Sequence, residues 1–141
     1  MLFRSAVVDE GRTILFTTVS GVGRPVMSID AISTVTKQRR RVVERGGNPI
    51  YAPSGHLIFF RDASLLAIPF NVTSLETTGP AVAALDNIAL DQLGGPMVAL
   101  SPTGLLAYVD VENATKELVW LTRQGIEQPI SEARRAYTMR M

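Results

Sequence analysis

His56 is the chain's single histidine and the first residue to consider as a catalytic base or metal ligand. Either role needs partners, and the 141-residue sequence has no second histidine and no cysteine. No serine lies in a G-x-S-x-G elbow, so hydrolase chemistry is unsupported. We therefore expect His56 to be a surface or strand-end residue. We expect no catalytic residue, no cofactor and no metal site.

Two glycine-rich stretches, Gly21-Val22-Gly23 and Gly46-Gly47, resemble phosphate-binding loops only superficially. Neither is followed by the lysine and helix of a Walker loop, so hairpin and linker glycines are the favoured interpretation. Kinase signatures are missing too, because no glycine-rich loop precedes a strand lysine and no H-R-D occurs. The chain is therefore predicted not to be an enzyme.

The strongest charge cluster is basic and comprises Lys37, Arg39, Arg40, Arg41 and Arg45. A nucleic-acid surface would require interleaved aromatic residues and a basic domain, whereas this cluster has no aromatics and the net charge is +1. We favour an outermost strand whose exposed edge is protected from aggregation by charge. No nucleic-acid partner is expected.

The aspartates are scattered near predicted loops and none has the D-x-D-x-D-G spacing of a calcium loop. They are Asp30, Asp62, Asp86, Asp91 and Asp110. The segment 30–34 is predicted to be an Asx-type turn, with its counterpart at 71–74. Glycosylation patterns at Asn71 and Asn113 are short enough to arise by chance.

The composition indicates a folded chain, with 46% hydrophobic and 19% charged residues. Without cysteine it has no disulfide, which leaves the compartment open. The first residues lack the apolar core of a signal peptide, and no apolar run reaches membrane-spanning length. We expect a soluble protein without a membrane partner.

The elements that must position these residues are repeated. The stretch NPIYAPSGHLIFF at 48–60 returns as MVALSPTGLLAY at 97–108, with a weaker copy around Gly11. A period of about 50 residues indicates blades or solenoid turns. The turn Ser101–Gly104 has proline second and glycine fourth, where a positive φ is often needed. The flanking apolar runs are continuous, which is typical of strands covered on both faces.

The predicted fold is all-β, with about three repeated units of four antiparallel strands in a single domain, as blades or solenoid turns. The repeats are expected at 1–46, 47–95 and 96–135, with 136–141 as the first strand of a further blade. The expected strands are 2–8, 13–19, 24–30 and 38–44, then 49–52, 56–61, 65–70 and 81–85, then one from 97, 105–110, 117–122 and 127–130. Trp120 and Tyr108 could line a ligand surface, but packing within the blades is favoured.

The stretches YAPSGHLIFFRDASLLAIPFNVTSLETTGPAV, ALSPTGLLAYVD and LVWLTRQGIEQPI resemble TolB-like, WD-repeat-like bacterial β-propellers. The nearest variety is the propeller region C-terminal to bacterial serine/threonine protein kinases. The resemblance runs from about Thr13 to Tyr137 and rests on the S-P-x-G turn and the L-V-W-x-x-R-x-G strand. It implies a partial β-propeller of about three four-stranded antiparallel blades with a scaffold or sensing role, and it brings no catalytic residue.

Two functions stay open. The first is a non-catalytic module that binds a protein or small ligand. The alternative is a regulatory or substrate-gating propeller fragment of a larger protein kinase or prolyl-oligopeptidase-type peptidase. Because propellers have about four to eight blades, about three blades also predict a homodimer that closes a ring, with 136–141 as a latch.

Overall fold

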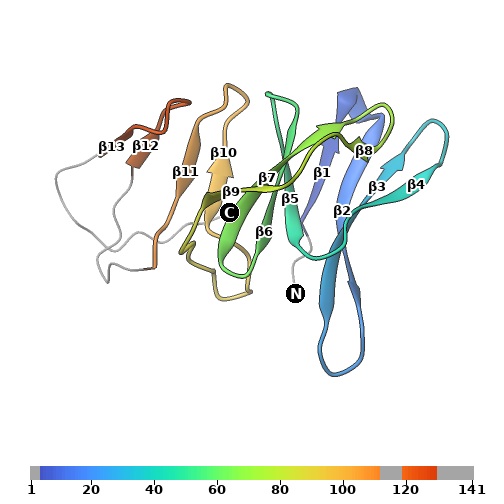
Figure 1. The fold of residues 1–141 in the computed structure, drawn as a ribbon, viewed down its shortest axis with the longest axis horizontal. Helices are drawn as coiled ribbons and strands as arrows, with labels where there is room; N and C mark the ends of the chain where they lie inside the picture. The colour runs from blue at the N-terminus through green and yellow to red at the C-terminus, as the bar shows by residue number, and fades with distance from the viewer. Residues whose placement is uncertain (1–3, 112–118, 130–141) are drawn as a thin grey trace.

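The computed structural model describes residues 4–111 and 119–129, and this part of the chain is built from antiparallel strands and turns. Three sheets follow one another along the chain and lie side by side (Figure 1). The first sheet holds β1 (Ser5–Val8), β2 (Thr13–Ser20), β3 (Val26–Ser33) and β4 (Arg39–Val43), with a short 3₁₀ turn, η1 (Asp9–Gly11), after β1. The second holds β5 (Gly47–Ala52), β6 (His56–Arg61), β7 (Ser64–Asn71), β8 (Glu76–Thr77) and β9 (Val82–Leu85). The third holds β10 (Val98–Leu100), β11 (Leu106–Tyr108), β12 (Val119–Leu121) and β13 (Glu127–Pro129).

The prediction of an all-β chain with antiparallel sheets is confirmed. In the first and third sheets the strands pair in the order in which they occur, so each of these sheets is a simple meander. The second sheet differs in having five strands, because β8 and β9 both pair with β7, at Phe70–Asn71 and at Leu65–Ala67 respectively. The sequence predicted only the second of these short strands. The expected strand at 136–141 and the pattern at Asn113 lie outside the described residues.

The predicted turn at 30–34 is wrong. Asp30 is a buried residue in the middle of β3, paired with Phe16 on one side and Arg41 on the other. The strand continues to Ser33, and the turn follows it, with the Ser33 hydroxyl accepting a hydrogen bond from the Thr36 amide at 3.1 Å. The counterpart turn is confirmed, because the Asn71 side-chain oxygen accepts from the amides of Thr73 and Ser74 at 2.9 and 3.1 Å.

The repeated glycine turn has the expected conformation. Gly55 and Gly104 have φ of 81° and 89°, in the left-handed region that favours glycine. Each glycine amide donates to the carbonyl three residues earlier, on Ala52 and Ser101, at 3.0 Å in both turns. These turns join β5 to β6 and β10 to β11, and they lie at the same edge of the molecule (Figure 1).

Two apolar clusters fill the spaces between neighbouring sheets. The first joins the first and second sheets and contains Leu15, Ile29, Ala31, Val43, Leu57, Phe59, Phe70 and Leu75. The second joins the second and third sheets and contains Phe60, Leu65, Ile88 and Val98. Strand β6 serves both, since Leu57 and Phe59 belong to the first cluster while Ile58 and Phe60 contribute to the second. Its continuous apolar run therefore reflects burial on both faces, as predicted.

The connection between the first two sheets is tight. Gly46 has φ of 143°, and its amide donates to the Met27 carbonyl at 2.9 Å. A Cβ at this position would lie 2.6 Å from Cδ2 of Phe59. The backbone at Gly46 thus approaches the Phe59 ring more closely than any residue with a Cβ allows.

The part of the chain that the structure describes contains no helix with the length and hydropathy of a membrane span.

Candidate functional site

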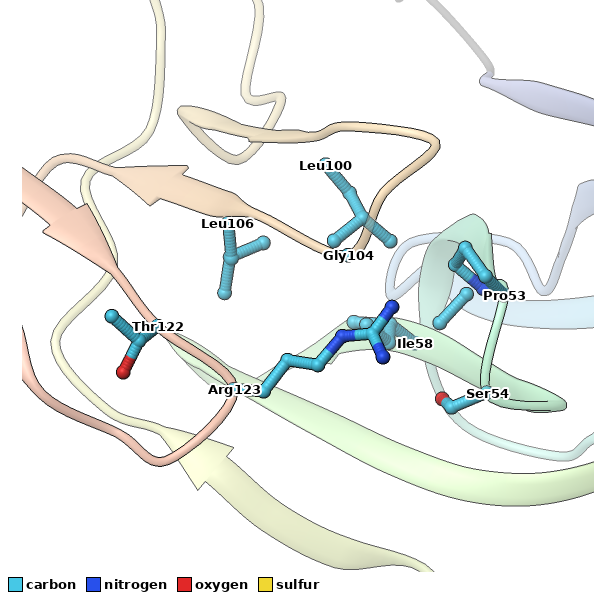
Figure 2. Close-up of a pocket in the computed structure, with 9 residues that line it drawn as sticks. Pro53, Ser54, Ile58, Leu100, Gly104, Leu106, Thr122 and Arg123 are labelled. Carbon is cyan, nitrogen blue, oxygen red and sulfur yellow. The ribbon is translucent and has the colours of Figure 1, made fainter.

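A cleft opens between the second and third sheets at the edge that carries the glycine turns (Figure 2). Its volume is about 380 Å³, within the range of small-molecule sites. It is lined by Ala52, Pro53, Ser54, Ile58, Leu100, Gly104, Leu106, Thr122 and Arg123. The turns β5–β6, β10–β11 and β12–β13, which belong to the second and third sheets, therefore meet around one opening.

The cleft combines an apolar floor with a polar mouth. Ile58, Leu100 and Leu106 supply the floor from strands on both sides, and Ile58 and Leu106 also pack against the second apolar cluster. Ser54 and Thr122 bring hydroxyl groups to the mouth. This is the arrangement expected of a binding site, in which apolar surface gives affinity and a few polar groups fix orientation.

Arg123 is the charged residue of the lining, and its guanidinium extends across the cleft (Figure 2). Its Nη2 donates to the Thr103 carbonyl at 2.8 Å. The Arg123 side chain can pack against Gly104 because glycine has no Cβ, and a Cβ at that position would lie 3.1 Å from Nε of Arg123. A second, shallower hollow lies beside Arg123 and Leu105, and it is also lined by Thr103 and Gln128. The guanidinium is thus anchored at one end and reachable by a ligand.

A serine–histidine pair lies at the same mouth. Nδ1 of His56 is 3.1 Å from the Ser54 hydroxyl and 3.2 Å from the Ser54 carbonyl oxygen. A carbonyl can only accept, so the tautomer with a proton on Nδ1 satisfies this contact. In that tautomer Nδ1 donates and does not take the serine proton, whereas in the other tautomer it accepts from the Ser54 hydroxyl. His56 is the first residue of β6, which confirms its prediction as a strand-end residue.

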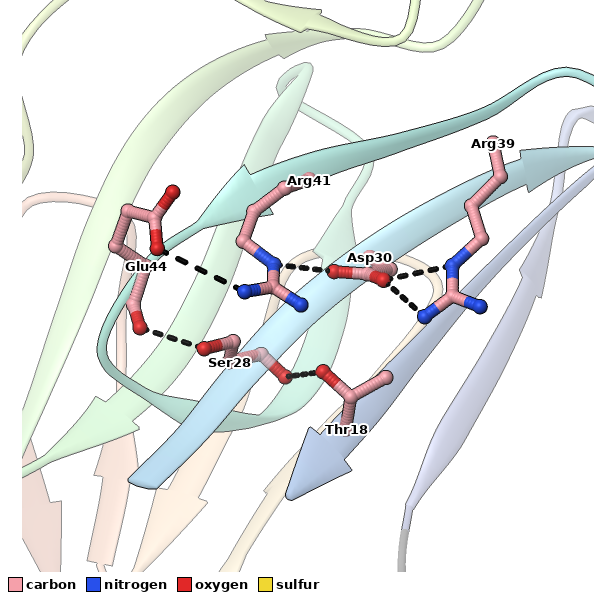
Figure 3. A network of polar contacts seen from close by, with 6 residues as sticks. All are labelled: Thr18, Ser28, Asp30, Arg39, Arg41 and Glu44. Atoms are coloured by element: carbon pink, nitrogen blue, oxygen red, sulfur yellow. Dashed lines mark hydrogen bonds and ion pairs between the residues drawn. The ribbon is translucent and has the colours of Figure 1, made fainter. Parts of the chain in front are cut away.

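Three residues of the basic cluster, Arg39, Arg40 and Arg41, lie on β4, the last strand in the order of the first sheet, as predicted for an edge strand. Lys37 precedes this strand and Arg45 follows it. The arginines of β4 do more than protect that edge. Arg39 and Arg41 donate through Nε to the two carboxylate oxygens of Asp30 at 2.7 and 2.8 Å (Figure 3). Arg40 points the other way and forms an ion pair with Glu76 of the second sheet.

Asp30 is 3% exposed, while the side chains of both arginines reach solvent. Burial acts to raise the pKa of Asp30, but the hydrogen bonds and charges of Arg41 and Arg39 outweigh it and leave that pKa below its ordinary value. Arg39 also lies over the Phe16 ring, at 5.3 Å from its centre. The cluster is therefore a satisfied ion-pair network on the outer face of the first sheet.

Two of the other aspartates, Asp86 and Asp91, accept local hydrogen bonds. Asp86 accepts a hydrogen bond from the Ser64 hydroxyl at 2.7 Å. Asp91 accepts from the amides of Leu93 and Gly95, both at 2.8 Å, and these backbone hydrogen bonds lower its pKa. Among the residues that the structure describes, no group of three or more histidine, aspartate or glutamate residues is placed to hold a metal.

Of the two aromatic candidates, Tyr108 is half-buried against the second apolar cluster, as the packing prediction requires. The side chain of Trp120 lies outside the described part of the structure. Sequence reasoning did not single out Arg123, although R-Q-G after a strand signals a turn, as S-P-x-G does. Nor did it single out the Ser54–His56 contact, which their spacing of two residues across a turn could have suggested.

No protein-family model, no curated protein and no solved structure matches this chain significantly.

Proposed function

We propose that the chain is a non-catalytic β-propeller repeat module that binds a ligand or protein in the cleft between its second and third sheets. Its three sheets would be consecutive blades of an incomplete ring. The cleft carries the proposal, because three turns from two sheets converge on an apolar floor and an available guanidinium. Support for the blades comes from the meander order of the first and third sheets and from apolar clusters on both faces of the second.

The lack of an activated nucleophile at the cleft favours binding over turnover. Ser54 is the serine of the lining, and the tautomer favoured for His56 leaves it without a base. A regulatory or substrate-gating role inside a larger kinase or peptidase stays the alternative. The same cleft would then receive a segment of the attached domain. A catalytic domain in the same reading frame would select this alternative.

Self-association is a second part of the proposal. On β2, Leu15 faces the first cluster, so the alternation of a strand places Ile14 and Phe16 on the opposite, half-buried face. Arg39 lies over the Phe16 ring, so Ile14 is the β2 residue offered for an apolar contact. Val7 of the adjoining β1 is 66% exposed. Covering such a face stabilises an assembly by about 25 cal/mol per Å² of apolar surface. A homodimer of two arcs would have about six blades, within the usual ring size.

Light scattering on a size-exclusion column tests the assembly. We expect a dimer, and we expect deletion of residues 136–141 to weaken it or to cause aggregation. A folded monomer at micromolar concentration, unchanged by the deletion, would contradict the self-association.

Binding itself is tested with a defined fragment library by ligand-observed nuclear magnetic resonance. We expect fragments to bind and to be recovered unchanged. Ser54→Trp places a large ring at the mouth and should abolish that binding, while Ser74→Trp, on an exposed turn of the second sheet, should leave it intact. Binding that survives Ser54→Trp, an absence of any binding, or consumption of a fragment would overturn the proposed function.

A further inference from the structure

We infer that the cleft recognises a carboxylate carried on an apolar body, with Arg123 binding the carboxylate and the floor binding the apolar part. This inference rests on the proposed function and names its ligand class. Charge is its first support: of the nine lining residues, Arg123 alone has a charged type of side chain. A guanidinium has five N–H donors in a planar fork that matches a carboxylate.

Among the residues that the structure describes, few partners occupy the donors of Arg123. Nη2 donates to the Thr103 carbonyl, and none of the carboxylates whose side chains the structure describes forms an ion pair with Arg123. Arg39, Arg40 and Arg41, in contrast, each pair with an aspartate or glutamate. The contact with Thr103 holds the guanidinium over the cleft, which reduces the entropy lost when a ligand binds.

The remaining lining indicates a monoanion with an apolar body. Ile58, Leu100 and Leu106 offer apolar surface beneath the guanidinium. The Thr122 hydroxyl accepts from the Ile126 amide at 3.3 Å and retains its own proton to donate. A phosphate would call for further positive charge or a nest of backbone amides, whereas a carboxylate is satisfied by one arginine fork and a hydroxyl.

Two sources share this chemistry, a free organic acid and the carboxyl terminus of a peptide. Hexanoate represents the first, and N-acetyl-leucine represents the second. Their neutral counterparts, hexanamide and N-acetyl-leucinamide, keep the apolar body and remove the charge. Affinities are measured on the whole chain by titration followed through amide chemical shifts.

We expect at least one acid to bind about 10-fold or more tightly than its amide, as a charge-assisted bidentate contact predicts. Tighter binding of hexanoate would point to a free acid, and tighter binding of N-acetyl-leucine would point to a peptide terminus. Arg123→Gln should remove the preference for the acid. Arg24→Gln makes the same charge change on an exposed loop of the first sheet and should leave the preference unchanged.

Arg123→Lys keeps the charge but not the fork, and it should retain part of the preference. If Arg123→Gln fails to fold, Arg123→Lys still tests whether the preference for the acid depends on the guanidinium. Equal affinity for acids and amides, a preference unchanged in both Arg123 variants, or no binding of either acid would overturn the inference. The proposed function would still stand in each of these cases if neutral fragments bind at the cleft and Ser54→Trp abolishes their binding.

Discussion

The two spaces between the sheets are closed in different ways. Between the first and second sheets, a large apolar cluster is bordered by hydrogen bonds that cross the interface, such as Thr13 Oγ1 to the Val72 carbonyl and the Asn48 amide to Thr17 Oγ1. Between the second and third sheets, the cluster is smaller and is completed by Ile88 of the linking segment. The Ile88 amide donates to the Ala63 carbonyl, at the end of β6 opposite the cleft.

We infer from this difference that the first interface stabilises the fold and that the second provides the binding site. The first interface is filled and joined by polar contacts, so we expect it to carry most of the folding free energy. The second interface is sealed at the Ala63 end and open at the turn end, where the cleft lies. Binding sites are commonly drawn from the less stable part of a fold, because a ligand must replace contacts that the protein does not make itself.

The largest expected effect comes from a matched pair of leucine substitutions, one in each interface. Leu57 is 0% exposed in the first interface, so Leu57→Ala should lower the free energy of unfolding by about 3–5 kcal/mol. Leu106 is half-buried at the floor of the cleft, and Leu106→Ala should lower it by less than about 2 kcal/mol. Urea unfolding measures both. Equal losses would mean that the two interfaces are equally filled.

A glycine pair sharpens the description of the first interface. Gly46→Ala and Gly23→Ala both place a side chain at positive φ, which costs about 1–2 kcal/mol. Only the alanine at position 46 would also collide with Phe59, because the space around Gly23 is open. Thermal unfolding should therefore show a clearly larger loss for Gly46→Ala, and similar losses would remove the close approach from the account.

Asp30 gives a test that depends on pH. Its pKa in the folded chain is lowered, so its contribution to stability is complete above its unfolded pKa of about 3.9 and is lost as pH falls through the folded value. Asp30→Asn should cost about 1–3 kcal/mol at pH 7. The difference from the unmodified protein should shrink below about pH 4. A difference independent of pH in urea unfolding would assign the loss to packing.

The smallest effect is expected at the ion pair that joins β4 to β8. Arg40 and Glu76 are both well exposed, with side chains 42% and 55% accessible, so water and salt screen their attraction. A double-mutant cycle with Arg40→Gln and Glu76→Gln should give a coupling of about 0–1 kcal/mol. A coupling several times larger would show that charge, and not apolar packing, holds the first interface together.

The sequence predicted what depends on local pattern. The continuous run in β6 indicated burial on both faces, and Leu57, Ile58, Phe59 and Phe60 do alternate between the two clusters. The fourth position of the repeated turn required glycine, and Gly55 and Gly104 have positive φ.

What the sequence did not predict depends on contacts between segments. Asp30 was assigned to a turn because aspartate favours turns locally, and its arginine partners arrive only when β4 folds back on β3. The position of Arg123 in the cleft lining depends on turns from two sheets that meet around it. The propeller and its repeats remain a proposal, since their ring depends on surfaces beyond those of the three sheets.

Native-state hydrogen exchange tests the contrast between the interfaces most directly. The amides of Gly46 and Asn48 donate into the first interface, to the Met27 carbonyl and to Thr17 Oγ1, whereas the amides of Gly104 and Val109 are hydrogen-bonded within the third sheet and its turn. We predict that Gly46 and Asn48 exchange only through global unfolding, with the free energy found in urea. Gly104 and Val109 should exchange through a smaller, local opening. Exchange at Gly104 and Val109 that is as slow as at Gly46 and Asn48 would contradict the account.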